Sequence, residues 1–156
     1  MNTYRIVVGV DGSEGGERAL RWAAGEAERR GGTVEAVIGW TWDGIDTGLG
    51  TPTNPSGAKE LAEKTLTRTV TAVTTVYPNV AIAAEAVQAG PATALIRAAR
   101  DADLLVLGSH GHGRLYHAVV GSVTEECIRA ATCPVVVVPV PHRERATRPA
   151  EVEVAR

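Results

Sequence analysis

Residues 103–108 read Asp-Leu-Leu-Val-Leu-Gly, and a loop rich in glycine and histidine follows them. A short, nearly continuous apolar run indicates a strand buried on both faces, as in a parallel sheet. The loop spans residues 108–121, and a helical pattern covers residues 122–131. This stretch therefore predicts a strand, a loop and a helix of an α/β protein.

The same alternation of strand and helix patterns extends along the rest of the chain. Short apolar runs predict further strands at residues 5–10, 33–40, 80–87 and 134–139. Apolar residues at helical spacing predict the other helices at residues 14–30, 58–77 and 92–100. Residues 43–57, rich in Gly, Thr and Pro, have the composition of a surface loop. We therefore expect an α/β fold: a doubly wound, five-stranded parallel sheet in the order 3-2-1-4-5, with helices on both faces.

Composition favours a single folded domain. The chain has 156 residues, of which 44% are apolar and 22% charged, as in ordinary globular proteins. We expect this domain to cover residues 1–140, followed by a polar, flexible tail at residues 141–156. The net charge of −2 gives no basic footprint for nucleic acid, and the apolar runs are too short for a membrane helix. The N-terminus lacks a signal-peptide pattern and the two cysteines fit free thiols, so we expect a cytoplasmic protein.

The predicted strand order defines where a ligand would bind. The first and fourth strands are neighbours in this order, and the chain leaves them in opposite directions. Ligands of such sheets bind beyond the carboxyl ends of the strands at this switch point. The two loops that flank it, residues 9–13 and 108–121, are both rich in glycine.

The second of these loops has the properties of a phosphate site. Gly108 and Gly111 are followed, after nine residues, by Gly121. Glycines let a ligand approach bare backbone N–H groups, and a run of such groups forms a nest for anionic oxygens. A helix then begins, and its first turn has free N–H donors and a favourable dipole. Its first three residues are Ser122, Val123 and Thr124.

Two common phosphate motifs are absent from this loop. A P-loop requires Lys-Ser/Thr after its second glycine, where this chain has Arg114-Leu115. The dinucleotide fingerprint Gly-x-Gly-x-x-Gly fails because Tyr116 stands at the position of the third glycine. The sequence therefore supports neither a P-loop NTPase nor a classical dehydrogenase.

In these motifs the chain resembles the universal stress protein family, and specifically its ATP-binding branch. The signature of that branch, Gly-x2-Gly-x9-Gly-Ser/Thr, is matched by Gly108, Gly111, Gly121 and Ser122. Residues 8–13, Val-Gly-Val-Asp-Gly-Ser, and residues 133–139, Cys-Pro-Val-Val-Val-Val-Pro, match the family as well. The resemblance covers about residues 5–140. It implies an adenine-nucleotide alpha-hydrolase-like fold, bound ATP and an accompanying Mg²⁺.

The resemblance also implies roles for individual residues. Asp11 is expected near the ribose and phosphates, and Gly39, beside Ile38, is expected to contact adenine through its backbone. The histidines at 110, 112 and 117 match no standard zinc spacing, so we expect loop residues beside a phosphate and no dedicated metal site. The residues expected to bind the nucleotide are Gly9, Asp11, Gly39, Gly108, Ser109, His110, Gly111, His112, Gly113, Arg114, Gly121, Ser122, Val123 and Thr124.

Each of these assignments has a plainer structural alternative. Ser122 and Glu125 have the spacing of a capping box, which would serve the helix alone. Asp11 is equally a candidate N-cap of the first helix, with Ser13 as its competitor. Residues Val135–Val138 form an apolar strand at a sheet edge, which predicts a homodimer through this strand unless the tail covers it.

The sequence thus predicts an ATP-binding, dimeric regulatory or stress-response protein. One alternative is a slow ATPase or phosphotransferase that uses the same nucleotide site, with His110 or His112 as candidate bases. Because nothing in the sequence fixes either histidine, we expect at most weak hydrolysis. The other alternative is a ligand-free dimerisation module in which the glycine loop is only structural.

Overall fold

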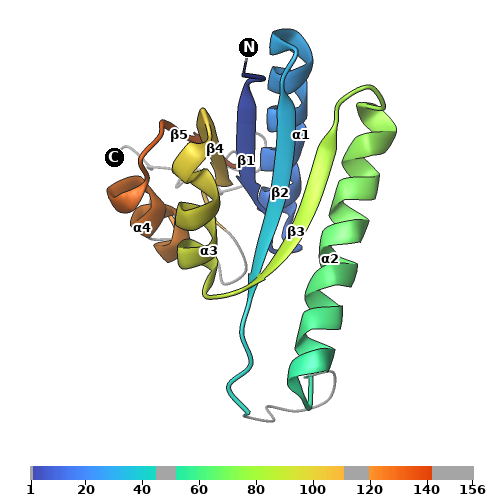
Figure 1. Cartoon of the computed structure of the whole chain (residues 1–156), viewed down its shortest axis with the longest axis vertical. Helices are drawn as coiled ribbons and strands as arrows, with labels where there is room; N and C mark the ends of the chain where they lie inside the picture. The colour runs from blue at the N-terminus through green and yellow to red at the C-terminus, as the bar shows by residue number, and fades with distance from the viewer. Residues whose placement is uncertain (1, 45–51, 111–119, 142–156) are drawn as a thin grey trace, which may run out of the picture.

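The computed structural model describes residues 2–44, 52–110 and 120–141. These residues form one parallel sheet of five strands in the order β3-β2-β1-β4-β5, with helices on both faces (Figure 1). The predicted fold class and strand order are therefore confirmed. In chain order the elements are β1 (Arg5–Gly9), α1 (Glu14–Arg30), β2 (Thr33–Trp40), α2 (Pro55–Val76), β3 (Ile82–Gln88), α3 (Pro91–Ala98), the short 3₁₀ helix η1 (Ala99–Asp101), β4 (Leu104–Gly108), α4 (Ser122–Ala130) and β5 (Val135–Val138).

Alternating side chains of the central strands supply two separate cores. Ile6 and Val8 of β1 face α1 and α2, whereas Val7 faces α3 and α4. All three are fully buried, because parallel strands in the middle of such a sheet have helices on both sides. The chain has no Phe, and small side chains such as Ala23 and Ala94 let the helices pack closely on the sheet.

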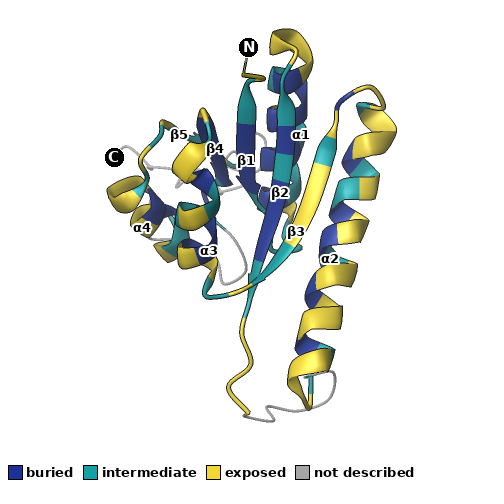
Figure 2. Cartoon of the chain, in the orientation of Figure 1, coloured by how far each residue is buried: buried dark blue, intermediate teal, exposed yellow. Residues whose placement is uncertain are grey.

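Burial falls off toward the β3 edge of the sheet. The middle of β3, residues 83–85, is exposed, while β1 and β2 are largely buried (Figure 2). In the part of the chain that the structure describes, no helix is long and apolar enough to cross a membrane.

Two predicted boundaries were wrong by a few residues. α2 begins at Pro55 rather than residue 58, because Asn54 caps it by accepting a hydrogen bond of 2.7 Å from the Gly57 N–H. Proline is favoured at this first helical position, where its missing N–H is not needed. β3 begins at Ile82 rather than residue 80, because the N–H of Val80 bonds the Tyr77 carbonyl and prolongs the turn after α2.

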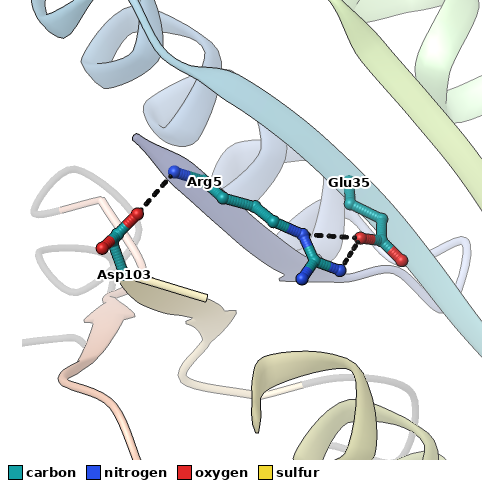
Figure 3. Close-up of polar contacts among 3 residues, drawn as sticks. All are labelled: Arg5, Glu35 and Asp103. Atoms are coloured by element: carbon teal, nitrogen blue, oxygen red, sulfur yellow. Dashed lines mark hydrogen bonds and ion pairs between the residues drawn. The ribbon is translucent and has the colours of Figure 1, made fainter. Parts of the chain in front are cut away.

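Arg5 ties the beginning of β1 to both neighbouring strands (Figure 3). Its backbone N–H donates to Asp103 at 2.8 Å, and its guanidinium Nε donates to Glu35 of β2 at 3.2 Å. The guanidinium and the Glu35 carboxylate also form an ion pair. These contacts hold β1 and its neighbours together at the amino-terminal ends of the strands. A ligand would bind at the opposite, carboxyl ends.

Glu85 of β3 carries a pH-dependent cost of folding. A hydrogen bond with the Glu35 carboxyl, desolvation and the Glu35 charge raise the pKa of Glu85 above its ordinary value of 4.5, although the Arg5 charge opposes this. The folded state therefore holds this proton more tightly than the unfolded chain does. Folding stability is consequently lost as the pH rises from the unfolded to the folded pKa, and the loss persists above it.

We expect Glu85→Gln to remove this cost, because a neutral amide can still donate to Glu35. Its melting temperature should exceed that of the wild type at about pH 7 and should match it at about pH 4 or below. Thermal unfolding followed by circular dichroism at both pH values checks this. An equal difference in melting temperature at both pH values would contradict it.

Candidate functional site

A cavity of about 500 Å³ opens at the carboxyl ends of β1 and β4. This is the switch point of the sheet, and its volume suits a small-molecule ligand. Its lining residues come from β1, β2, β4, the beginnings of α1, α3 and α4, and the segments that connect them. They are Gly9, Val10, Asp11, Ser13, Gly16, Val37, Gly39, Pro91, Leu95, Leu107, Gly108, His110, Val120, Gly121, Ser122, Val123, Thr124 and Glu125.

The turn between β1 and α1 forms one wall of the cavity. Gly12 makes the turn with a φ of 82°, a conformation that favours glycine. Ser13 is the N-cap of α1 and accepts the Gly16 N–H at 3.2 Å. Asp11 does not cap the helix; its Oδ1 accepts the Ser13 N–H at 2.9 Å and also the Ser13 hydroxyl. Ser13 is thus the helix cap, and Asp11, bonded to Ser13, is one of the residues that line the cavity.

The first turn of α4 forms the opposite wall. The N-cap is Gly121, which has no side chain to cap the helix, and the N–H of Glu125 bonds the Gly121 carbonyl at 3.0 Å. Ser122 lies inside the helix, so the capping-box alternative for Ser122 and Glu125 is wrong. Residues 122–124 line the cavity, and their N–H groups have no acceptor within the helix because they lie in its first turn. They are therefore available to an anionic ligand.

Side-chain and backbone contacts fix this turn beside the end of β4. The Thr124 hydroxyl donates to the Gly108 carbonyl at 2.9 Å, and Thr124 is only 5% exposed. The Gly121 N–H donates to the Ser109 carbonyl at 2.7 Å, and the Ser109 N–H donates to Val138 of β5 at 3.0 Å. Thr124 therefore offers a ligand its backbone N–H, because its hydroxyl is engaged with β4.

Close backbone packing explains some of the glycines and leaves one unexplained. A Cβ on Gly108 would lie 2.8 Å from the Gly15 carbonyl oxygen, and a Cβ on Gly39 would lie 2.8 Å from the Ala89 oxygen. Among the described residues, a Cβ on Gly121 would meet nothing closer than the Ser109 oxygen at 3.6 Å, an ordinary contact. The φ of Gly121 is −71°, which any residue can adopt. The fold therefore requires glycine at 108 and 39, whereas the described part of the chain gives no packing reason for glycine at 121.

The described lining of the cavity contains no lysine or arginine. Its titratable side chains are Asp11, His110 and Glu125. Glu125 forms an ion pair with Arg129, and His110 Nδ1 lies 3.2 Å from Ser109 Oγ. Attraction for an anion thus comes from backbone N–H groups and helix dipoles in the described residues. Within residues 2–44, 52–110 and 120–141, no group of three or more His, Cys, Asp or Glu side chains could hold a metal ion.

The cavity brings together most of the predicted binding residues that the structure describes. Ser109 does not line it: this residue is 7% exposed and connects the loop to β5. The stretch 111–114, which holds Gly111, His112, Gly113 and Arg114, lies outside the described residues. The predicted residues at the cavity are Gly9, Asp11, Gly39, Gly108, His110, Gly121, Ser122, Val123 and Thr124.

Sequence reasoning missed the apolar part of the lining and the beginning of α3. Pro91 begins α3 shortly after β3 ends, so it lies at the carboxyl ends of the strands like the other lining residues. The position of this proline after a predicted strand could have identified it from the sequence. Leu95, one turn further along α3, lies over β1, where a Cβ on Gly9 would come within 2.8 Å of it. The other missed residues are Val10, Ser13, Gly16, Val37, Leu107, Val120 and Glu125.

Fold and cavity together define a doubly wound α/β protein with a cavity at its switch point. Comparison with known proteins identifies the family to which it belongs. Residues 3–139 match the model of the universal stress protein family, and the chain belongs to this family. It is 35% identical over 138 residues to a universal stress protein of Mycobacterium tuberculosis, covering 85% of this chain and 44% of that protein. A relative from Mycolicibacterium smegmatis is 34% identical over 135 residues, covering 85% and 45%. The chain thus spans less than half the length of these relatives.

Solved structures share the fold over nearly the whole chain. A universal stress protein from Archaeoglobus fulgidus in complex with dAMP is 27% identical, with a TM-score of 0.63, covering 88% of this chain and 98% of that one. Another structure from this organism is 28% identical, with a TM-score of 0.65 and coverage of 88% and 94%. A universal stress protein in complex with cAMP is 22% identical, with a TM-score of 0.67 and coverage of 90% and 100%, a likeness that concerns the fold alone.

Proposed function

We propose that this protein binds an adenine nucleotide, ATP in particular, in the cavity at the switch point, and acts as a nucleotide-dependent regulatory or stress-response protein. Membership of the universal stress protein family supports the general role. The related structure in complex with dAMP supports an adenine nucleotide. The observation that carries the proposal is Gly121: the packing of the described residues does not require a glycine there, yet a phosphate that approaches the N–H groups of α4 would.

In this proposal the phosphates occupy the α4 wall and the base occupies the apolar end of the cavity. The N–H groups of residues 122–124 donate to phosphate oxygens, close to Gly108 and His110. The adenine lies near Gly39, between apolar side chains such as Val37 and Leu95. Asp11 lies near the ribose and phosphates.

A Mg²⁺ ion accompanying the phosphates fits the residues present. Mg²⁺ binds nucleotides through phosphate oxygens, water and one or two carboxylates. Two carboxylates line the cavity within the described residues, Asp11 and Glu125, and Asp11, on the turn between β1 and α1, would hold the ion. When bound, the ion would neutralise phosphate charge, which no lysine or arginine of the described lining does.

Nucleotide retained through purification tests this function. We expect ATP to be released when the purified protein is denatured and the supernatant is chromatographed. We also expect calorimetry on stripped protein to give micromolar or tighter affinity for ATP. Titration with AMP and cAMP then ranks the alternatives. Absence of adenine nucleotide from the supernatant, together with no heat of binding, would refute the proposal and favour the ligand-free module.

We further propose that two copies of the chain pair through β5. This strand is at the sheet edge, and its residues Val135–Val138 are all half-buried although they are apolar. Pairing with the same strand of a second copy would cover this edge by a two-fold contact. We expect a dimer by analytical ultracentrifugation and a monomer for Val137→Lys. A monomeric wild type, or a dimeric variant, would contradict this interface.

The cytoplasmic location also remains a prediction.

A further inference from the structure

We propose that the outer edge of β3 is a docking surface for an extended, basic segment of a partner protein, which would add to the sheet as a further strand. This β3 surface consists of Ile82, Ala83, Ala84, Glu85 and Ala86. It lies at the edge of the sheet opposite to β5, and none of its residues lines the cavity. The proposal therefore does not depend on nucleotide binding.

Alternate residues of β3 have backbone groups that no neighbouring strand of the described sheet uses. In a parallel ladder, one residue directs its N–H and C=O to one neighbour, and the next residue directs them the other way. The Val34 N–H of β2 bonds the Ala81 carbonyl at 3.0 Å, so residues 81, 83 and 85 face β2. The N–H and C=O groups of Ile82, Ala84 and Ala86 therefore point outward from the sheet.

β3 has few of the features that protect an edge strand from further pairing. Such strands are usually very short, or they contain lysine, proline or a bulge. β3 has 7 residues, contains neither lysine nor proline, and pairs with β2 one to one along its whole length. Ala83, Ala84 and Glu85, in the middle of the strand, are exposed (Figure 2). Alanine side chains do not obstruct an approaching backbone, so the edge is open to an added strand.

Among the described residues, a helix covers one face of β3. Ile82 and Ala86 pack on the core beneath α1 and α2, so residues 83 and 85 are on the opposite face. On that face Val87, near the end of the strand, packs against the core beneath α3, whereas Ala83 and Glu85 are exposed. An added strand could therefore place a side chain beside Glu85 without displacing a helix.

The charges beside Glu85 favour a basic partner. Glu85 lies next to Glu35, and the guanidinium of Arg5 pairs with Glu35. The charge of Asp101 also acts on Arg5, and Asp103 accepts the Arg5 backbone N–H. One guanidinium thus stands among several carboxylates. A lysine or arginine on an added strand would supply positive charge, and opposite charges on paired strands stabilise the pairing.

The same carboxylate disfavours a second copy of this chain as the occupant. Two β3 edges related by a two-fold axis would bring two Glu85 side chains and their acidic surroundings together, and like charges on paired strands destabilise them. The charge therefore opposes self-pairing and selects a partner of opposite sign. Main-chain hydrogen bonds to Ile82, Ala84 and Ala86 would supply affinity, and Glu85 would supply specificity.

A blocked peptide of sequence Thr-Val-Arg-Val-Arg-Val-Thr tests this surface on the full chain. The peptide is titrated into isotope-labelled protein, and each backbone amide is followed by nuclear magnetic resonance and by its rate of hydrogen exchange. We expect the amides of Ile82, Ala84 and Ala86 to exchange rapidly in the free protein and at least about tenfold more slowly with saturating peptide. The same peptide with glutamate in place of arginine should bind at least about tenfold more weakly.

Two variants separate the backbone contribution from the charge. Ala84→Pro removes an outward N–H and leaves the bonds of residues 83 and 85 to β2 in place, so it should abolish binding of the arginine peptide. Ala84→Ser keeps this N–H and is the matched control, with the affinity of the wild type. Glu85→Lys should reverse the preference, so that the glutamate peptide binds more tightly than the arginine peptide.

The outcomes that would overturn the proposal are distinct. If the arginine peptide does not bind, or protects amides of β5 and not those of β3, the surface is wrong. If the glutamate peptide binds equally well, or Glu85→Lys leaves the preference unchanged, the partner is not basic. If the β3 amides become protected with rising protein concentration and no peptide, the occupant is a second copy and the proposal is wrong.

Discussion

Gly121→Ala is expected to weaken ATP binding at least about tenfold, which is about 1.4 kcal/mol, while the protein stays folded. Within the described residues the added methyl group would meet only ordinary contacts, the nearest at 3.6 Å, and the backbone angles at this N-cap suit alanine. It would, however, stand beside the N–H groups of α4, where a phosphate must approach closely. Calorimetric titration of both proteins with ATP measures the difference.

Gly90→Ala is the matched control for this substitution. Gly90 is likewise an N-cap glycine, at the beginning of α3, and a Cβ there would meet nothing within 4 Å. Both variants lose an N-cap glycine, so both should lose about 1 kcal/mol or less of stability. Only Gly121→Ala should lose affinity. Equal ATP affinities for the two folded variants would contradict the proposed phosphate position.

Gly15→Ala is expected to destabilise the protein by roughly 1–3 kcal/mol or more, the usual cost of overpacking. Alanine is intrinsically about 1 kcal/mol better than glycine in a helix, so propensity alone predicts the opposite sign. We nevertheless expect a loss of stability, because a Cβ on Gly15 would overlap the backbone carbonyl of His110. A backbone atom cannot move aside as the end of a flexible side chain can. Urea denaturation of the variant and the wild type measures the change.

Gly57→Ala is the control, since Gly57 lies in the first turn of α2. A Cβ there would meet the Asn54 side chain at 3.3 Å and Pro52 at 3.6 Å, with no backbone oxygen in the way. We expect this variant to be as stable as the wild type or more so. If Gly15→Ala behaves like Gly57→Ala, then α1 does not pack on the loop after β4 as the structure has it.

The strand order could be predicted because it follows from alternation and general rules of connection. Apolar runs such as residues 103–107 identify buried parallel strands, and right-handed crossovers leave few possible orders. The switch point then places the turn after β1 and the loop after β4 at one site. The strands of the sheet and their order could therefore be predicted without knowledge of individual side-chain contacts.

Details of the site depend on contacts between residues distant in sequence, and these could not be predicted. The spacing of Ser122 and Glu125 fits a capping box, yet the Gly121 N–H bonds the Ser109 carbonyl and Gly121 becomes the cap. The requirement for glycine at 108 comes from Gly15, which is far from it in the chain. Asp11 and Ser13 are close in sequence, and both were candidate N-caps of α1. The structure distinguishes them, because Ser13 caps the helix and donates its hydroxyl hydrogen to Asp11.

The central claim is that bare N–H groups at the beginning of α4 hold the phosphates of a nucleotide. Titrating isotope-labelled protein with ATP and following each backbone amide by nuclear magnetic resonance tests this directly. The amides of Ser122, Val123 and Thr124 should shift strongly, whereas that of Gly57, bonded to Asn54 at the beginning of α2, should not. Saturable ATP binding that leaves these three amides unshifted would contradict the claim.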